Sequence, residues 1–295
     1  MPEVRPRRFA HRLHSLWFAV VVAMVLLVAV VFVFAQHTNS PASPATAAQS
    51  SAETDEQRIA DLVVANHILF DQGVLDGFGH VSVRSVKNPK HFYMARSLAP
   101  ALVTKEEIFE FDENSQPIDP HGKRMYGERF IHGEIYRARP DVQAVVHSHS
   151  IAVVPFGTVN VPLRPIMHMA GFLPQQVPVF EIREVKGDDN GILIHDTIAG
   201  AALAKVLGSG PVALMRGHGM AVAGPDVRTA VFRAIYTQLD AQVEAQALAL
   251  GNPKFLNAAE AANVNKVNEE VVIRAWELWA PHAELATAPF RANKP

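Results

Sequence analysis

The chain has 295 residues, of which 49% are hydrophobic, so it is long enough to bury a substantial core. Its 27 lysines and arginines nearly balance its 29 aspartates and glutamates, and this balance gives no electrostatic reason to expect nucleic acid as a partner. The absence of cysteine excludes disulfide bonds and thiol chemistry, and it disfavours a structural zinc site.

The first predicted element is a hydrophobic segment over residues 16–35, which carries no charge and follows four arginines. A helix of this length spans a bilayer core of about 30 Å, and the arginines favour a cytoplasmic N-terminus. We therefore expect a basic cytoplasmic region over 1–15, then a transmembrane anchor or a signal peptide over 16–35. The rest of the chain would be membrane-anchored or exported and extracytoplasmic (periplasmic), or cytosolic if residues 16–35 are neither anchor nor signal.

Residues 36–55 are rich in Ser, Ala, Thr and Pro without apolar periodicity, which predicts a flexible linker. The folded domain is expected over 56–255, and it opens with a helix over 56–75 in which apolar residues recur at helical spacing. The next segment is predicted to contain strands over 81–84, 92–95 and 108–112 and a helix over 128–139.

The second half of the domain continues to mix strands and helices. We expect a strand over 143–149, a strand over 177–185, a helix over 198–207, a strand over 211–215 and a helix over 226–250. Residues 256–295 are predicted to form a C-terminal helical tail, with a short docked helix and a frayed end. The pattern indicates one α/β domain with helices on both sides of a sheet.

Three histidines lie at the ends of two of these strands. His147 and His149 end the strand over 143–149 and point the same way, because strand side chains alternate between faces. His218 lies in a Gly-His-Gly sequence after the strand over 211–215, where glycine lets the backbone turn sharply. Three neutral imidazoles with an open fourth position describe a catalytic metal centre.

Several motifs in this order resemble the class II aldolase and adducin family over roughly residues 56–255. They are Gly79-His80-Val81-Ser82-Val83-Arg84, Glu128, Ile135-Tyr136, Arg139-Pro140-Asp141-Val142, Ala144 to His149, and Arg216-Gly217-His218-Gly219. The resemblance implies a three-layer α/β/α domain with a central mixed, mostly antiparallel sheet. It also implies a homotetramer with metal sites near subunit interfaces. The predicted fold class is this α/β domain plus an N-terminal hydrophobic helix.

Carried over residue by residue, the resemblance makes His147, His149 and His218 the ligands of one divalent metal ion per subunit, zinc first, with Mn, Co or Fe as alternatives. Glu128 would be the acid/base carboxylate beside the metal, a role that a partly buried glutamate near a cation can fill. The alternative for Glu128 is a carboxylate stabilised at a helix N-terminus. His168 falls near a catalytic tyrosine of the aldolases and would be a proton donor, or else an ordinary loop histidine.

The chain departs from the family where aldolases bind a substrate phosphate. It has His80 in place of asparagine, Ser97-Leu98 in place of Ser-Gly, and Tyr126-Gly127 in place of two hydroxyl residues before Glu128. These departures disfavour a sugar phosphate, although Ser82 and Ser97 remain. The predicted substrate-binding residues are His80, Ser82, Arg96 and Ser97.

An arginine in this pocket is suited to a substrate carboxylate, because guanidinium and carboxylate form paired hydrogen bonds. Arg96 is the first candidate and Arg84 the second, and the alternative for each is an ordinary ion pair. Family branches with the same histidine and a segment like Arg96 to Thr104 resemble decarboxylases of hydroxylated aromatic acids.

The predicted function is that of a metal-dependent carbon-carbon lyase acting on a small molecule. It would cleave a hydroxy acid by decarboxylation, or a hydroxy-carbonyl compound by retro-aldol cleavage, through a metal-stabilised enolate. The alternatives are an Fe(II)-dependent oxygenase on the same fold and a non-catalytic, adducin-like scaffold.

Overall fold

A computed structural model describes residues 53–292 of the chain. The predictions for residues 1–15 and 16–35, and for most of the linker, lie outside the described residues. Within residues 53–292, no helix combines the length and the apolar character needed to cross a membrane. The first described helix begins at Asp55, inside the predicted linker, because Thr54 and Gln57 form a capping box there.

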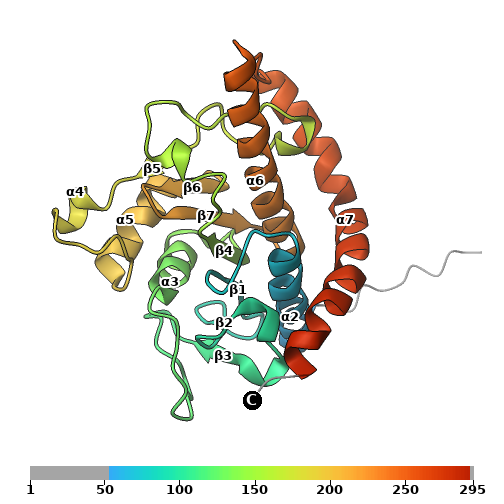
Figure 1. Cartoon of the computed structure of the whole chain (residues 1–295). Helices are drawn as coiled ribbons and strands as arrows, with labels where there is room; N and C mark the ends of the chain where they lie inside the picture. The colour runs from blue at the N-terminus through green and yellow to red at the C-terminus, as the bar shows by residue number, and fades with distance from the viewer. Residues whose placement is uncertain (1–52, 293–295) are drawn as a thin grey trace, which may run out of the picture. The chain divides into compact units, whose positions relative to one another are not determined.

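The described residues form a seven-stranded sheet with helices on both faces (Figure 1). The strands are β1 (His80–Arg84), β2 (Phe92–Ala95), β3 (Ile108–Phe111), β4 (Ala144–Ser148), β5 (Val179–Phe180), β6 (Val212–Met215) and β7 (Gly219–Gly224). The helices are α2 (Asp55–Asp71), α3 (Arg129–Ala138), α4 (Arg183–Lys186), α5 (Thr197–Leu207), α6 (Val227–Leu250) and α7 (Ala258–Ala292).

The strand order is β3-β2-β1-β4-β7-β6-β5. Neighbouring strands are antiparallel except β5 and β6, which are parallel. This confirms the mixed, mostly antiparallel sheet. The order places β4, which contains His147 and is directly followed by His149, between β1 and β7 at the centre.

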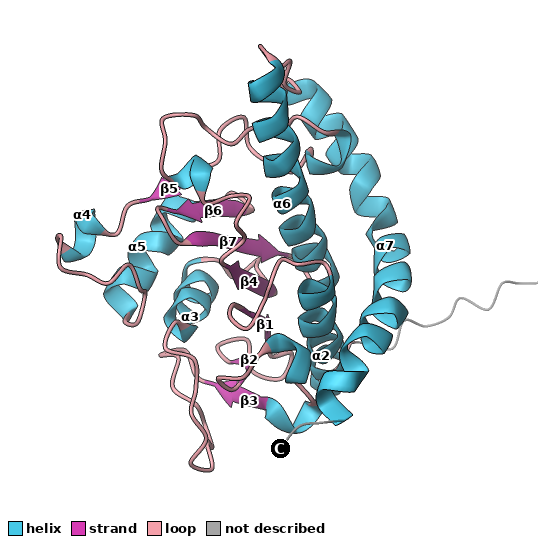
Figure 2. Ribbon diagram, in the orientation of Figure 1, coloured by secondary structure: helices cyan, strands magenta, loops and turns pink. Residues whose placement is uncertain are grey.

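Alternation along β4 divides the core into two layers. Ala144 and Val146 pack with residues of α2, α6 and α7, whereas Val145 packs with residues of α3 and α5. These two groups of helices lie on opposite sides of the strands (Figure 2). The polar end of β4 continues this alternation, so His147 shares with Val145 the face that α3 covers.

The predicted strand over 177–185 is wrong. β5 covers only Val179–Phe180, and Arg183–Lys186 form the short helix α4. Among the described strands, β5 is at the edge of the sheet and pairs only with β6, and Val179 is 40% exposed. The apolar run therefore reflects side chains at the rim of the sheet rather than a long buried strand.

The predicted short helix in the tail is also wrong, since α7 runs for 35 residues. Val272, Trp276 and Ala283 lie on one face of α7 and are buried in the core that α2 and α6 also line. The opposite face is exposed, and two prolines, Pro281 and Pro289, lie inside the helix. Interior prolines normally end a helix, so packing against α2 and α6 accounts for its length.

Two buried carboxylates on α6 make the stability of the domain depend on pH. Burial raises the pKa of Asp240 to about 6 and that of Glu244 to about 7, although backbone N–H groups of Ile166, Met167 and Arg164 bond to them. Between pH about 4 and pH about 7 the folded chain holds protons that the unfolded chain has released. The pair therefore stabilises the fold less as the pH rises through this window.

We expect Glu244→Gln to raise the free energy of unfolding by about 1–3 kcal/mol at pH 8 and to change it little at pH 5. Glutamine keeps an oxygen for the Arg164 N–H group and carries no charge to bury. Denaturant unfolding at the two pH values measures the effect, with Glu270→Gln on the exposed face of α7 as the control. A loss of stability at pH 8 would contradict this account.

Candidate metal centre and active site

Glu128, His147, His149 and His218 meet at one end of the central strands, with one ligand atom of each within 4.8 Å of the others. The Nε2 atoms of His147 and His149 are 3.2 Å apart, and those of His149 and His218 are 2.9 Å apart. Oε2 of Glu128 lies 3.5, 3.9 and 3.4 Å from the Nε2 atoms of the three histidines in chain order. The structure thus brings together the four residues that the sequence singled out.

The pairing of β4 with β7 explains why the histidines meet. Ser148 pairs with Met220, so the end of β4 lies beside the start of β7 and the turn before it. His218 occupies that turn, which Gly217 makes with a φ of +65°. β7 was missed from the sequence, because a segment of small residues flanked by glycines lacks the usual strand composition.

Glu128 is the N-cap residue of α3, but its side chain makes no capping hydrogen bond. Oε1 instead accepts a hydrogen bond from the Ile194 N–H group at 3.1 Å, and Oε2 faces the histidines. Burial alone would raise the pKa of this carboxyl, but His147 and the hydrogen bonds of the three histidines hold the pKa well below its usual range. Glu128 is therefore an ionised carboxylate next to three imidazoles.

The proton positions and the spacing both fit a divalent metal ion. His147 Nδ1 lies 3.0 Å from the carbonyl oxygen of Met220 and donates to it, which leaves the Nε2 lone pair facing the cluster. Burial lowers the pKa of His147, so the ring is neutral. Ligand atoms about 2.0–2.1 Å from a tetrahedral zinc ion are separated by about 3.3 Å, close to the distances here. The cluster can therefore hold a metal ion.

Gly219 allows β7 to approach the end of β4. A Cβ atom at this position would lie 1.9 Å from the carbonyl oxygen of Ser148 and 3.0 Å from Cα of His149. We expect Gly219→Ala to lower the free energy of unfolding by about 1–3 kcal/mol, since the backbone must move, and to weaken metal binding. Thermal unfolding tests this against Gly77→Ala, where a Cβ atom meets nothing within 4 Å; equal stability of the two variants would refute it.

A cavity of about 310 Å³ opens beside the cluster, and Glu128, His149, His80 and Ser97 line it. Its other walls are largely apolar: Phe78, Leu98, Ala99 and Tyr126. Phe78 is 68% exposed and its ring centroid lies 6.4 Å from that of His149. Sequence reasoning missed Phe78, although a phenylalanine between two glycines near the first strand was a signal of an exposed aromatic side chain.

Two of the predicted substrate-binding residues do not line this cavity. Ser82 is fully buried and its hydroxyl bonds to His132 and Tyr136 of α3. The Arg96 guanidinium pairs with Glu107 and donates a further bond to the carbonyl oxygen of Ser97. Their predicted contacts with a substrate are therefore not supported by the geometry.

His168 lies in a short 3-10 helix, His168–Ala170, and is exposed. Its carbonyl oxygen accepts a hydrogen bond from Asn268 Nδ2 of α7 at 2.9 Å. Within residues 53–292 the structure shows no contact between its imidazole and the four-residue cluster. Its role as a proton donor stays a prediction.

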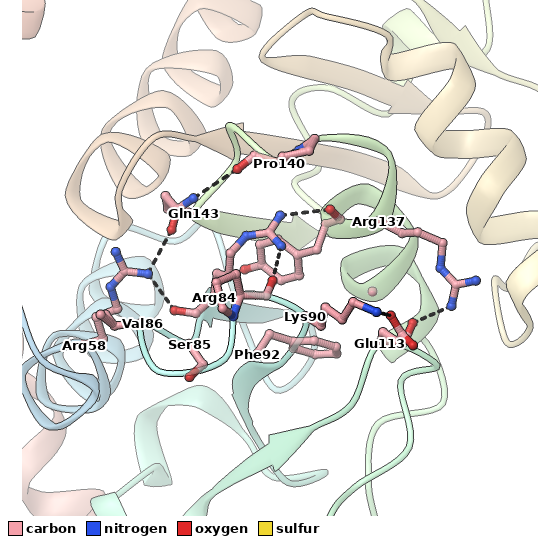
Figure 3. Close-up of a pocket in the computed structure, with 13 residues that line it drawn as sticks. Arg58, Arg84, Ser85, Val86, Lys90, Phe92, Glu113, Arg137, Pro140 and Gln143 are labelled. Atoms are coloured by element: carbon pink, nitrogen blue, oxygen red, sulfur yellow. Dashed lines mark hydrogen bonds and ion pairs between the residues drawn. The ribbon is translucent and has the colours of Figure 1, made fainter.

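A second cavity, of about 710 Å³, lies at the far ends of β1 and α3 and is lined by none of the four cluster residues (Figure 3). Arg84 borders this second cavity and donates to four carbonyl oxygens, those of Pro89, Tyr136, Arg139 and Val142. Two of these carbonyls, those of Tyr136 and Arg139, belong to the last turn and the C-cap of α3, where the helix dipole favours a cation. Arg84 therefore has a structural role and is not available for a substrate at the metal centre.

A family model, the class II aldolase and adducin N-terminal domain, matches residues 60–245. The fold, the order of the motifs and the cluster at the end of β4 all agree with this match. The chain belongs to the class II aldolase and adducin family.

Two relatives and one solved structure are similar to this chain over most of its length. Decarboxylase tropJ of Talaromyces stipitatus is 36% identical over 242 residues, which cover 74% of this chain and 91% of that protein. A 3,4-dihydroxyphthalate decarboxylase of Terrabacter is 29% identical over 211 residues, which cover 67% of this chain and 82% of that protein. Among solved structures, an L-fuculose 1-phosphate aldolase from Glaciozyma antarctica superposes with a TM-score of 0.66 at 23% identity, over 81% of this chain and 94% of that one. The last likeness shows the fold alone.

Proposed function

We propose that this protein is a metal-dependent decarboxylase that acts on a hydroxylated aromatic acid. The observation that carries the proposal is the convergence of Glu128 and three histidine Nε2 atoms at the mouth of a cavity with apolar walls. The similarity to decarboxylases supports carbon dioxide, rather than an aldehyde, as the leaving group.

His147, His149 and His218 would hold the metal ion. A divalent ion held there would supply a Lewis acid, which would stabilise the negative charge left on carbon when the bond to the carboxylate breaks. Glu128 lies within 4 Å of each of these histidines. In this proposal Glu128 takes the proton of the substrate hydroxyl and returns one to the ring carbon that loses the carboxylate.

The cavity walls favour an aromatic ring over a sugar phosphate. Tyr126 and Leu98 occupy places where the family's aldolases have residues that bind phosphate, and neither side chain provides a phosphate cradle. The Tyr126 hydroxyl is used by the carbonyl oxygen of Leu98, and burial raises the pKa of this phenol to about 12. Phe78 and Tyr126 offer ring surfaces on which an aromatic substrate can stack.

The test is turnover by the full-length protein of two substrate sets: hydroxybenzoic and hydroxyphthalic acids, scored by release of carbon dioxide, and ketose 1-phosphates, scored by release of aldehyde. We expect turnover of at least one acid and none of the phosphates. Turnover of a phosphate alone would establish an aldolase. Oxygen uptake during the reaction would favour the Fe(II) oxygenase, and metal binding without any turnover would favour a scaffold.

The N-terminal residues add a proposal about location. The uncharged segment over 16–35, preceded by arginines, supports a membrane-anchored or exported protein with its catalytic domain in the periplasm. Cell fractionation with an antibody to the domain tests this, and recovery only in the cytosol would refute it. A homotetramer stays a proposal, for which the native mass in solution is the measurement.

A further inference from the structure

A row of buried polar side chains joins β1 to α3 beneath the active-site cavity. His80 and Ser82 are two residues apart on β1, so both lie on the face that α3 covers. His132 and Tyr136 lie one turn apart on α3. His80 Nδ1 is 2.6 Å from His132 Nε2, Ser82 Oγ is 2.6 Å from His132 Nδ1, and Ser82 Oγ is 2.7 Å from the Tyr136 hydroxyl. All four side chains are buried, so the polar atoms that face one another in this row must pair as donor and acceptor.

Tyr136 determines which group donates in each hydrogen bond of the row. Burial raises the pKa of this phenol well above its usual range, so the hydroxyl keeps its proton. Among the described residues, Ser82 Oγ is the acceptor that the structure provides for it, and a buried hydroxyl donates where it can. Ser82 has only one proton, which it then donates to His132 Nδ1.

The same pairing of donors with acceptors determines which ring nitrogen of each histidine carries the proton. His132 accepts at Nδ1, and burial lowers its pKa to about 3, so this neutral ring carries its proton on Nε2 and donates it to His80 Nδ1. His80 therefore accepts at Nδ1 and carries a proton on Nε2. His80 also lines the cavity, and Nε2 is the ring nitrogen left for a ligand.

We propose that Tyr136, Ser82 and His132 are positioning residues that fix the tautomer of His80, so that its Nε2–H group donates a hydrogen bond to the substrate carboxylate. The proposal rests on the proposed function for the identity of that substrate. It assigns to His80 the recognition that the sequence assigned to Arg96, whose guanidinium is bound by Glu107. It also gives Ser82 a role without substrate contact.

The first test observes the tautomers directly in the full-length protein, by solid-state ¹⁵N NMR of labelled histidine. The variants His80→Asn and His132→Gln assign the two rings. We expect both rings to carry a proton on Nε2 and none on Nδ1. A proton on Nδ1 of either ring would overturn the proposal. This result does not depend on activity, so it stands apart from any failure of the proposed function.

The second test compares two probes by calorimetry on the metal-loaded protein: 3,4-dihydroxybenzoate, which has a carboxylate, and catechol, which has none. We expect Ser82→Ala and His132→Leu each to weaken the binding of 3,4-dihydroxybenzoate by about tenfold, the effect of one hydrogen bond to a charged group. The affinity for catechol is expected to change by less than about twofold.

Two further variants separate positioning from general damage. His132→Gln keeps an N–H donor for His80 and is expected to bind 3,4-dihydroxybenzoate more tightly than His132→Leu. Thr237→Val removes a buried hydroxyl of α6 that donates to the carbonyl oxygen of Arg233. It is expected to change the affinity for neither probe. If Ser82→Ala weakened the binding of both probes equally, or did not weaken the binding of 3,4-dihydroxybenzoate, the positioning role would be contradicted.

Discussion

Replacing Glu128 with glutamine is expected to lower kcat by about 10²- to 10⁴-fold and to leave the metal content of the protein unchanged. Glutamine has the same shape and keeps an oxygen for the Ile194 N–H group. It cannot take up or return a proton at neutral pH, which is the task proposed for the ionised carboxylate. The three histidines remain to hold the metal ion.

Turnover and elemental analysis of the same preparation separate these effects. Glu134→Gln is the matched control, because this second carboxylate of α3 is buried away from the cluster and pairs with Arg137 at 3.5 Å. A Glu128→Gln protein with full kcat would exclude Glu128 from proton transfer. One that had lost its metal would instead make Glu128 an essential ligand.

The change His149→Ala is expected to remove both the metal ion and the activity, with a fall in turnover of at least about 100-fold. His149 stands between the other two histidines, with Nε2 atoms at 3.2 and 2.9 Å. Its loss leaves two imidazoles, too few for a three-histidine site.

Metal content by elemental analysis and turnover under saturating substrate measure the outcome. His282→Ala is the control, since this histidine lies on the exposed surface of α7 and bonds to Asp71. Full metal occupancy in His149→Ala would overturn the assignment of the ligands.

The residues of the site could be found from the sequence because the signals were local. His147 and His149 follow an apolar strand, so alternation alone put both side chains on one face. Gly217 and Gly219 around His218 indicated a sharp turn, and the structure has one. Glu128 was assigned through the resemblance to the family, which carried the acid/base carboxylate over to this position.

The surroundings of the site could not be predicted in the same way. Whether Ser82 faced the cavity or α3 depended on the pairing of β1 with β4 and on the cover from His132 and Tyr136, which are distant in sequence. Arg96 was assigned to the substrate because the sequence does not show that Glu107 lies beside it. Contacts between elements, rather than motifs, decided these roles.

The measurement that tests the account most directly is the release of carbon dioxide from hydroxybenzoic and hydroxyphthalic acids by three preparations of the full-length protein: as purified, after chelation, and after return of Zn²⁺, Mn²⁺, Co²⁺ or Fe²⁺. We expect release by the first, loss of release on chelation, and recovery with at least one of the four ions at about one ion per chain. Equal release by the chelated, metal-free protein would contradict a metal-dependent decarboxylase at Glu128 and the three histidines.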